Sequence, residues 1–510
     1  MTPDTTHTAG DPLLITTRSG AVRGDAENGV RTWRSIPFAA PPVGPLRLRA
    51  PQPAEPWQGV RDATAFGPVP PQRRGIEEVG AGKHTPISED CLTLNVWAPE
   101  TPSEEPVPVL VWFYGGAFTQ GAASASGYTN GHVTRRTGAI FVTINYRVGA
   151  LGFIDFTSFA SPEHPFDSNV GLRDQVAGLE WVRDNIAAFG GDPGNVTIFG
   201  ESAGGMSVIA LMCIPAAHGL FHKAFAMSPA PSSMYEPTLH ATWAGELVEA
   251  LGVSREAAAE ALATRPWEDL VAATETLTTK ITPSTHPSTL ASSPVVDGDF
   301  LPTHAIDAFR DGTAARVPLV IGTMANEGAF FDRILDVLPT TPSRIETMFS
   351  LTGADARDRV LAAYPSYPKK KAAIEVGGDV VFWLPSVQSA EAHSEHSPTW
   401  MYRLDFATPM MRLLGLGATH GMDMPAFFGN LGSGMGRIMT LLGGRRAYAA
   451  VGDRMLAAVA SLARTGSPGR DWPQYDAERR VTRIIDREDR LESDPRGERR
   501  RAWGDFRGFL

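Results

Sequence analysis

The chain of 510 residues is long enough for two or three average domains, although an α/β fold with insertions often reaches this length as one unit. Its composition, with 43% hydrophobic and 20% charged residues, is typical of a soluble globular protein and excludes wholesale disorder. The formal net charge of −10 argues against nucleic acid as a partner, because binding to phosphates needs a concentrated positive surface.

The amino terminus and the cysteine content bear on where the protein acts. The first 14 residues have no positively charged start and no long apolar core, and no run of 18 apolar residues follows them. The two cysteines, Cys91 and Cys213, allow at most one disulfide, so the fold does not depend on a disulfide framework. We therefore expect a cytoplasmic protein with no membrane partner, and we favour a monomer.

Along the chain, short apolar runs alternate with longer helical patterns, which is typical of a mostly parallel sheet covered by helices on both faces. The proline-rich stretch Ile36 to Trp57 is expected to be an extended, irregular lead-in at the sheet edge and not a helix. Apolar residues at helical spacing predict helices over Leu172 to Phe189 and over Tyr448 to Ala463. The expected strands are Val107 to Phe113, Ala139 to Asn145, Val196 to Phe199, Ala224 to Met227, Val317 to Gly322 and Trp400 to Phe406.

Two stretches interrupt this alternation, at about 236–290 and 332–397. The first is alanine-rich and reads as helical, and the second reads as mixed. Because lids and substrate walls are commonly built from insertions at strand ends, we expect both to form pocket walls. With no internal repeat and no long linker, residues 1–510 are expected to form a single α/β domain.

The stretch VTIFGESAGG, Val196 to Gly205, carries the clearest catalytic motif. A strand pattern leads into a GxSxG turn centred on Ser202, and an apolar helical run from Met206 to Ile214 follows. A strand-to-helix turn this tight forces the central residue into a strained backbone conformation and leaves room only for glycine two positions to either side. Ser202 is therefore expected to project its hydroxyl above the sheet as a nucleophile. A structural glycine turn with an idle serine is the alternative.

A second glycine-rich loop, Tyr114 to Phe118, follows the expected strand Val107 to Phe113. Small residues let its backbone N–H groups approach the oxyanion of a tetrahedral intermediate. We expect Gly116 and Ala117, together with Ala203, to donate these N–H groups. An ordinary strand-to-helix turn also uses glycines, so this loop alone leaves both interpretations open.

His420 is the strongest candidate base among the 12 histidines. It lies in a loop of small residues, Gly417 to Gly421, shortly after the last expected strand. In α/β hydrolases the base comes from this position, last in chain order after the nucleophile and the acid. A loop histidine without a catalytic role is the alternative.

Glu327 is the candidate acid, because it follows the carboxyl end of the expected strand Val317 to Gly322. From there its carboxylate could orient the imidazole of His420 and stabilise its charged form. Asp297 and Asp299 are rivals on chemistry, but no clear strand precedes them.

Several other motifs lack residues that their chemistry needs. His218 and His222 are four apart, but no glutamate follows His218 as a zinc-binding HExxH motif requires. His393 and His396 lie in a polar loop with the same deficiency. The stretch Gly80 to Thr85 resembles a phosphate-binding loop without its first glycine and its closing serine or threonine. We therefore expect no metal and no cofactor.

Many stretches match, in order, the patterns of one known family. They are IPFAAPPVGPLRLRAP (Ile36 to Pro51), SEDCLTLNVWAP (Ser88 to Pro99), FYGGAF, NYRVGALGF (Asn145 to Phe153), residues 169–205, SPVVDGDFLP, GTMANEG, GATHGMDMPAFFGN and RTGSPGRDWPQY (Arg464 to Tyr475). The chain thus resembles the type-B carboxylesterases, which include bacterial p-nitrobenzyl esterases and, more distantly, the cholinesterases. The resemblance implies an α/β-hydrolase fold.

The resemblance also implies roles for particular residues. It assigns Ser202 as nucleophile, Glu327 as acid, His420 as base, and Gly116, Ala117 and Ala203 as the oxyanion hole. It implies two structural ion pairs as well, Arg47 with Glu89 and Arg147 with Asp174.

The chain departs from the family pattern in two places. Cys91 matches a cysteine that is disulfide-bonded in many secreted relatives, but the region of its partner, Ala65 to Gln72, holds no cysteine. Where the family usually has Ser-Gly after a strand, this chain has Ser228 and Pro229, which we expect to reshape one wall of the pocket.

These observations predict a serine hydrolase that cleaves small-molecule carboxylic esters through an acyl-enzyme intermediate. An amidase or carbamate hydrolase with the same machinery is an alternative, and a non-catalytic binding protein of the same fold is a more distant one. Phe118, Phe331 and Phe382 are candidates for apolar pocket walls and equally for ordinary core.

Overall fold

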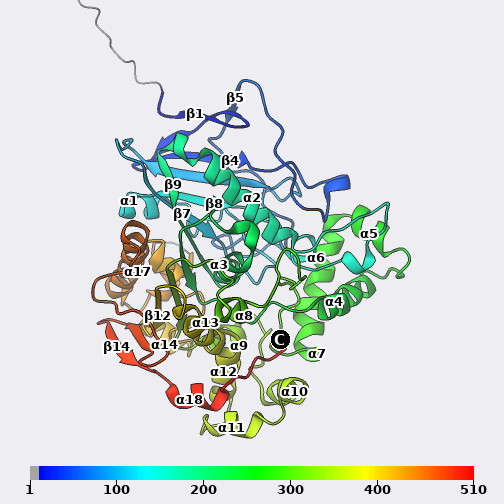
Figure 1. The fold of residues 1–510 in the computed structure, drawn as a ribbon, viewed down its shortest axis with the longest axis vertical. Coiled ribbons are helices and arrows are strands. Elements are labelled where there is room, and N and C mark those ends of the chain that lie inside the picture. Colours follow the sequence, from blue (N-terminus) through cyan, green and yellow to red (C-terminus); the bar gives the residue numbers. More distant parts are fainter. Residues whose placement is uncertain (1–10, 433, 510) are drawn as a thin grey trace, which may run out of the picture.

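A large twisted sheet forms the centre of the molecule (Figure 1). The computed structural model describes residues 11–432 and 434–509. In chain order the strands of this 11-stranded sheet are β3 (Asp25–Glu27), β4 (Val30–Pro37), β6 (Thr93–Pro99), β7 (Val107–Phe113), β8 (Ile140–Ile144), β9 (Gly191–Glu201), β10 (Lys223–Met227), β11 (Leu319–Met324), β12 (Thr399–Leu404), β13 (Val481–Ile485) and β14 (Arg490–Ser493).

The strand order across the sheet is β14-β13-β12-β11-β10-β9-β7-β8-β6-β4-β3. Neighbouring strands run parallel from β13 to β8 and antiparallel at both edges. Helices cover both faces of the parallel part, so its strands read as nearly continuous apolar runs. A separate three-stranded sheet is formed by β1 (Leu14–Thr17), β2 (Gly20–Arg23) and β5 (Val60–Asp62).

The six expected strands are confirmed as β7 to β12, with ends displaced by a few residues. The stretch Ile36 to Trp57 begins with the last two residues of β4, Ile36 and Pro37, and holds one short 3₁₀ turn at Gly44–Leu46. Polar side chains such as Thr32 and Arg34 interrupt the apolar pattern of β4, and a register shift between Trp33 and Ile36 interrupts its pairing with β6. A strand with such a pattern gives no clear apolar signal.

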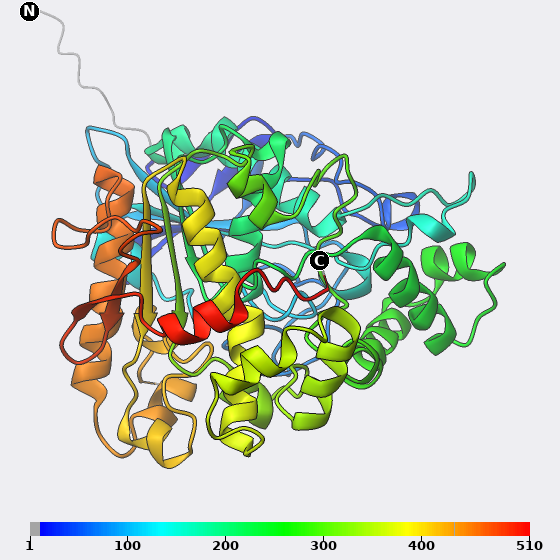
Figure 2. The same ribbon diagram turned by 60° about the horizontal axis from the view of Figure 1, so that its bottom comes forward.

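The helices lie on both faces of the sheet, and Figure 2 shows α17 and α13 on opposite sides of it. Leu172 to Phe189 is helical as predicted, as α2 followed by one short turn, and Tyr448 to Ala463 lies inside α17. The helices outside the two insertions are α1 (His132–Thr137), α2 (Val170–Asn185), α3 (Ala203–Cys213), α8 (Ala305–Arg310), α9 (Gly328–Arg333), α14 (Pro409–Leu413), α15 (Met424–Phe427), α16 (Gly434–Met439), α17 (Arg445–Thr465) and α18 (Gly497–Trp503).

Both insertions are helical, and Figure 1 shows them as the green helices at the right and the yellow-green helices at the bottom. The prediction of mixed structure for 332–397 is therefore wrong, since every regular element in it is a helix. Their helices are α4 (Pro237–Ala250), α5 (Ala258–Thr264), α6 (Trp267–Thr276) and α7 (Thr282–Thr285) in the first, and α10 (Pro342–Thr352), α11 (Arg357–Ala362), α12 (Lys370–Gly378) and α13 (Leu384–Ser394) in the second. Among the helices of the described residues, none is long and apolar enough to cross a membrane.

The structure contains both ion pairs that the family resemblance implies. Arg47 Nε donates to Glu89 Oε2 at 2.8 Å. Arg147 donates to Asp174 through Nε at 2.8 Å and through Nη2 at 2.7 Å, and both side chains are buried. The Arg147 pair joins the loop after β8 to α2, which makes it part of the support beneath the active edge of the sheet. Cys91 and Cys213 are both free thiols and buried.

Replacing Asp174 with alanine leaves the guanidinium of Arg147 buried without its counter-charge. We expect Asp174→Ala to lower the free energy of unfolding by about 3–5 kcal/mol, the range found when one partner of a buried pair is removed. Urea unfolding followed by tryptophan fluorescence measures this loss. As a control, Asp269→Ala removes an exposed partner of Arg265 and should cost no more than about 1 kcal/mol. Equal effects of the two substitutions would contradict the structural role of the buried pair.

Candidate active site

Ser202 lies in the turn between β9 and α3, in a strained backbone conformation. Its φ of 58° and ψ of −124° are rare for a residue with a side chain. Two backbone hydrogen bonds hold it there: its N–H donates to the carbonyl of Met227 at 2.9 Å, and its own carbonyl accepts from the N–H of Met206 at 2.8 Å. The hydroxyl is thereby presented at the carboxyl end of the sheet, where α/β folds place ligands.

The two glycines of the GxSxG motif are required by close packing. A Cβ added to Gly200 would lie 2.4 Å from the backbone of Gly204, and one added to Gly204 would lie 2.0 Å from the carbonyl oxygen of Phe113. Both distances are far inside van der Waals contact, so only glycine allows α3 to start directly above β9 and β7. This agrees with the steric requirement expected from the motif.

The loop after β7 contains a run of unusual backbone conformations. Gly116 has φ 124°, and Ala117 has φ 54°. Gly149, in the loop after β8, donates its N–H to the carbonyl of Phe118 at 2.6 Å and so fixes the end of the loop. Among the described residues, the N–H groups of Gly116, Ala117 and Ala203 have no hydrogen-bond acceptor. They are therefore free to bind an external oxygen atom.

His420 and Glu327 meet although 93 positions separate them in the chain. Glu327 lies between β11 and α9, and His420 lies in the loop after α14. His420 Nδ1 and Glu327 Oε2 are 2.7 Å apart, and the other carboxylate oxygen accepts the N–H of Met324 at 2.6 Å. Because a carboxylate accepts, Nδ1 carries the hydrogen, and in the neutral imidazole Nε2 is left as the acceptor nitrogen.

His420 and Ser202 line the same cavity, and Nε2 is the imidazole nitrogen not bonded to Glu327. It is buried and has no hydrogen-bond partner among the described residues. Ser202 Oγ and Nε2 make no hydrogen bond in this structure, and the nearest charged oxygen to Nε2 is Glu201 Oε1 at 3.4 Å. The structure thus joins His420 to Glu327 directly and places Ser202 beside them across the same cavity.

Buried charge surrounds the imidazole. Burial lowers the pKa of His420, but the carboxylates of Glu201 and Glu327 and the hydrogen bond to Glu327 raise it, with a net rise to about 9. Burial raises the pKa of Glu201 to about 8, although His420 acts in the opposite direction, and burial raises the pKa of Asp423 to about 7. Each of these groups therefore holds its proton to a higher pH than in water.

Glu201 and Asp423 were not singled out from the sequence. Glu201 lies inside the GxSxG motif, directly before the nucleophile and at the end of a buried strand. A carboxylate in that position is the feature of the sequence from which Glu201 could have been identified. Asp423 lies three positions after His420, and both of its carboxylate oxygens are buried without a hydrogen-bond partner among the described residues. An acidic residue so close to a candidate base is visible in the sequence, but its burial is not.

The cavity at Ser202 has a volume of about 350 Å³ and a mostly apolar lining. Phe330 and Phe331 form part of its wall, and Phe331 stacks on Phe382, which in turn packs against the imidazole of His420. Phe118 does not line this cavity and instead stacks on Phe153 in the core.

Two other features that the sequence suggested for the site do not line this cavity. Ser228 and Pro229 are not among its lining residues, so the expected change of pocket wall at that site is not seen. Asp297, a rival acid, accepts from Ser168 Oγ at 2.5 Å and from Asn169 Nδ2 at 2.9 Å, away from His420.

Among the described residues, no group of three or more His, Cys, Asp or Glu side chains is arranged to hold a metal ion.

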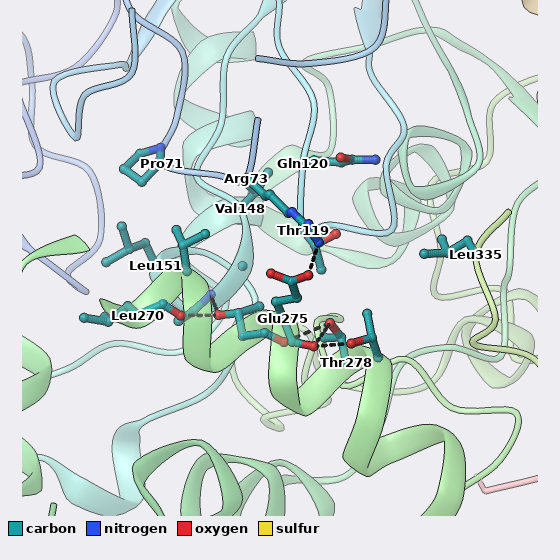
Figure 3. A pocket seen from close by; sticks show the side chains of 15 residues that line it. Pro71, Arg73, Thr119, Gln120, Val148, Leu151, Leu270, Glu275, Thr278 and Leu335 are labelled. Carbon is teal, nitrogen blue, oxygen red and sulfur yellow. Dashed lines mark hydrogen bonds and ion pairs between the residues drawn. The ribbon is translucent and has the colours of Figure 1, made fainter. Parts of the chain in front are cut away.

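A smaller cavity of about 160 Å³ adjoins the first, and Figure 3 shows its lining side chains. Gln120 and Leu335 line both cavities. Arg73 pairs with Glu275 of α6 across this second cavity. The first insertion thus contributes to a space beside the main cavity, whereas Leu335, from the second insertion, contributes to both.

Known proteins match the chain over nearly its whole length. Residues 11–503 match the model of the Carboxylesterase family. The para-nitrobenzyl esterase of Bacillus subtilis is 39% identical over 96% of this chain and 97% of its own, and the phenmedipham hydrolase of Pseudarthrobacter oxydans is 33% identical over 92% and 93%.

Solved structures show the same relationship. A thermophilic p-nitrobenzyl esterase superposes with a TM-score of 0.86 at 37% identity, covering 97% of this chain and all of its own. A carboxylesterase of Geobacillus stearothermophilus gives a TM-score of 0.83 at 32% identity over 96% of this chain. With the α/β-hydrolase fold and a serine presented at a strand-to-helix turn, the chain belongs to the carboxylesterase family and is a carboxylic ester hydrolase.

Proposed function

We propose that Ser202 is the nucleophile of this esterase, that His420 is its general base and that Glu327 orients the base. The observation that carries the proposal is the bond between His420 Nδ1 and Glu327 Oε2, which leaves Nε2 without a partner in a residue that lines the same cavity as Ser202. Catalytic hydrogen bonds are often long in free enzymes and tighten when substrate binds. We therefore expect the hydrogen bond between the Ser202 hydroxyl and Nε2 to form in the complex.

In the proposed reaction, Ser202 Oγ attacks the ester carbonyl carbon while His420 Nε2 accepts the hydroxyl proton. The free N–H groups of Gly116, Ala117 and Ala203 receive the negative oxygen of the tetrahedral intermediate. His420 then gives the proton to the leaving alcohol, and an acyl-enzyme forms. Water, deprotonated by His420, releases the acid and restores Ser202.

The substrate proposed is a small ester with apolar groups on at least one side of the carbonyl, because the cavity lining is mostly apolar. Two relatives carry the names para-nitrobenzyl esterase and phenmedipham hydrolase, which indicates aromatic groups as reasonable probes. Hydrolysis of amides or carbamates would use the same residues, and parallel substrate panels distinguish it. We also propose that residues 1–510 act as a single domain, with the insertions as walls.

Replacing Ser202 removes the proposed nucleophile. We expect Ser202→Ala to lower kcat/KM for short p-nitrophenyl esters by about 10⁴-fold or more, as in other serine hydrolases. Initial rates measure this change, with circular dichroism to verify folding. Ser350→Ala, at an exposed position of α10, should keep full activity. A folded Ser202→Ala protein with wild-type rates would remove Ser202 from the mechanism.

Replacing Glu201 with glutamine keeps the side-chain volume but removes one of the charges that raise the pKa of His420. A raised pKa keeps the imidazole protonated, and so unable to accept a proton, up to a higher pH. We therefore expect the acidic limb of the kcat/KM profile to move to lower pH in Glu201→Gln. The pH profiles of wild type and variant measure this, with Glu236→Gln, at an exposed carboxylate, as control. A limb that stays in place or moves upward would contradict the assignment of His420.

A further inference from the structure

Large apolar side chains gather on the surface beside the mouth of the catalytic cavity. We name this group the apolar rim. It consists of Ile334 at the end of α9, Leu413 and Leu414 at the end of α14, Ile438 of α16, and Leu441 and Leu442 after α16. Each is between 44% and 71% exposed. Such a concentration of exposed leucine and isoleucine in three short segments is typical of an interaction site.

The segments of the apolar rim are in contact with each other. Thr408, which caps α14, donates its hydroxyl to the carbonyl of Met439 at the end of α16, at 2.6 Å. After α14, a Cβ at Gly415 would lie 2.9 Å from the guanidinium of Arg333, next to Ile334. Figure 2 shows the gold segment that carries α14 and α16 beneath the orange α17. The segments that carry the rim therefore lie next to each other.

Five arginines flank the apolar rim, and none of them forms an ion pair within the described part of the chain. We name them the rim arginines: Arg333, Arg412, Arg437, Arg445 and Arg446. The ion pairs of the structure include Asp332 with Lys370 and Asp336 with Arg344, but none that uses the rim arginines. From position 409 to 446 the sequence holds one acidic residue, the buried Asp423.

We propose that the apolar rim docks on an anionic lipid surface. Exposed leucine and isoleucine side chains enter the boundary between headgroups and acyl chains, and unpaired arginines bind the negative headgroups around them. A second copy of the chain fits less well, because a two-fold contact through this face would bring arginines of both copies together. With a net charge of −10, the rest of the protein is repelled by such a surface, so only this face turns toward it.

Docking in this way deepens the proposed function, on which this part of the inference rests. Ile334 belongs to the rim and also lines the catalytic cavity, as does Met435 of α16. Part of the cavity wall therefore belongs to the docked face, which would give esters dissolved in a lipid layer a path to Ser202 that does not cross water. A one-sided contact needs no membrane-spanning segment, and it replaces the expectation that the protein has no membrane partner.

Cosedimentation of the full-length protein with vesicles tests the proposal. We expect binding to phosphatidylcholine vesicles that contain phosphatidylglycerol, weakening as salt is added, and little binding to phosphatidylcholine alone. Leu413→Ser with Leu441→Ser, and separately Arg412→Gln with Arg437→Gln, should each reduce binding at least tenfold. Matched controls are Leu351→Ser with Leu491→Ser, at leucines 55% and 48% exposed elsewhere, and Arg470→Gln with Arg487→Gln.

Hydrolysis of soluble p-nitrophenyl acetate separates this proposal from the proposed function. Rim variants should keep wild-type rates, which also shows that they fold, whereas Ser202→Ala should lose activity and still bind vesicles. Absence of binding to anionic vesicles at low salt, or equal losses in rim variants and controls, would overturn the docking proposal. So would a dimer, seen by sedimentation velocity, that disappears in the rim variants, because the face would then bind a second copy.

Discussion

The strained backbone of Ser202 is the constraint around which the active edge of the sheet is built. A φ of 58° is costly for serine, and it persists because hydrogen bonds to Met227 and from Met206 hold both sides of the turn. Gly200 and Gly204 let α3 press against β7 and β9 at distances that no side chain permits. The position of the hydroxyl is therefore set by packing of the protein interior, and it is in place before any substrate arrives.

The parallel sheet explains how distant residues come to share one cavity. Ser202 and Glu327 follow the carboxyl ends of β9 and β11, and these ends lie at the same edge because the strands between β8 and β13 are parallel. The loop after β12 brings His420 to that edge, where its bond to Glu327 fixes the ring. The loop after β8 supports the opposite side through Gly149 and the carbonyl of Phe118.

Much of this arrangement could be predicted because it depends on local sequence. The central strands are long apolar runs, and Ser202, Glu327 and His420 stand in short motifs whose positions relative to strands are readable. The strand β4 and the helical content of residues 332–397 could not be predicted from the sequence, since their patterns are set by packing against the rest of the fold. The burial of Glu201 and Asp423 around the imidazole likewise arises only when distant segments meet.

The central claim is that the fold activates one particular hydroxyl. Peptide mapping by mass spectrometry after treatment with a fluorophosphonate tests it most directly, with the native protein and the urea-unfolded chain treated side by side. The account predicts a single modified residue, Ser202, in the native protein and no modification of that serine in the unfolded chain. Modification of a different residue in the native protein, or equal modification of Ser202 in both samples, would contradict it.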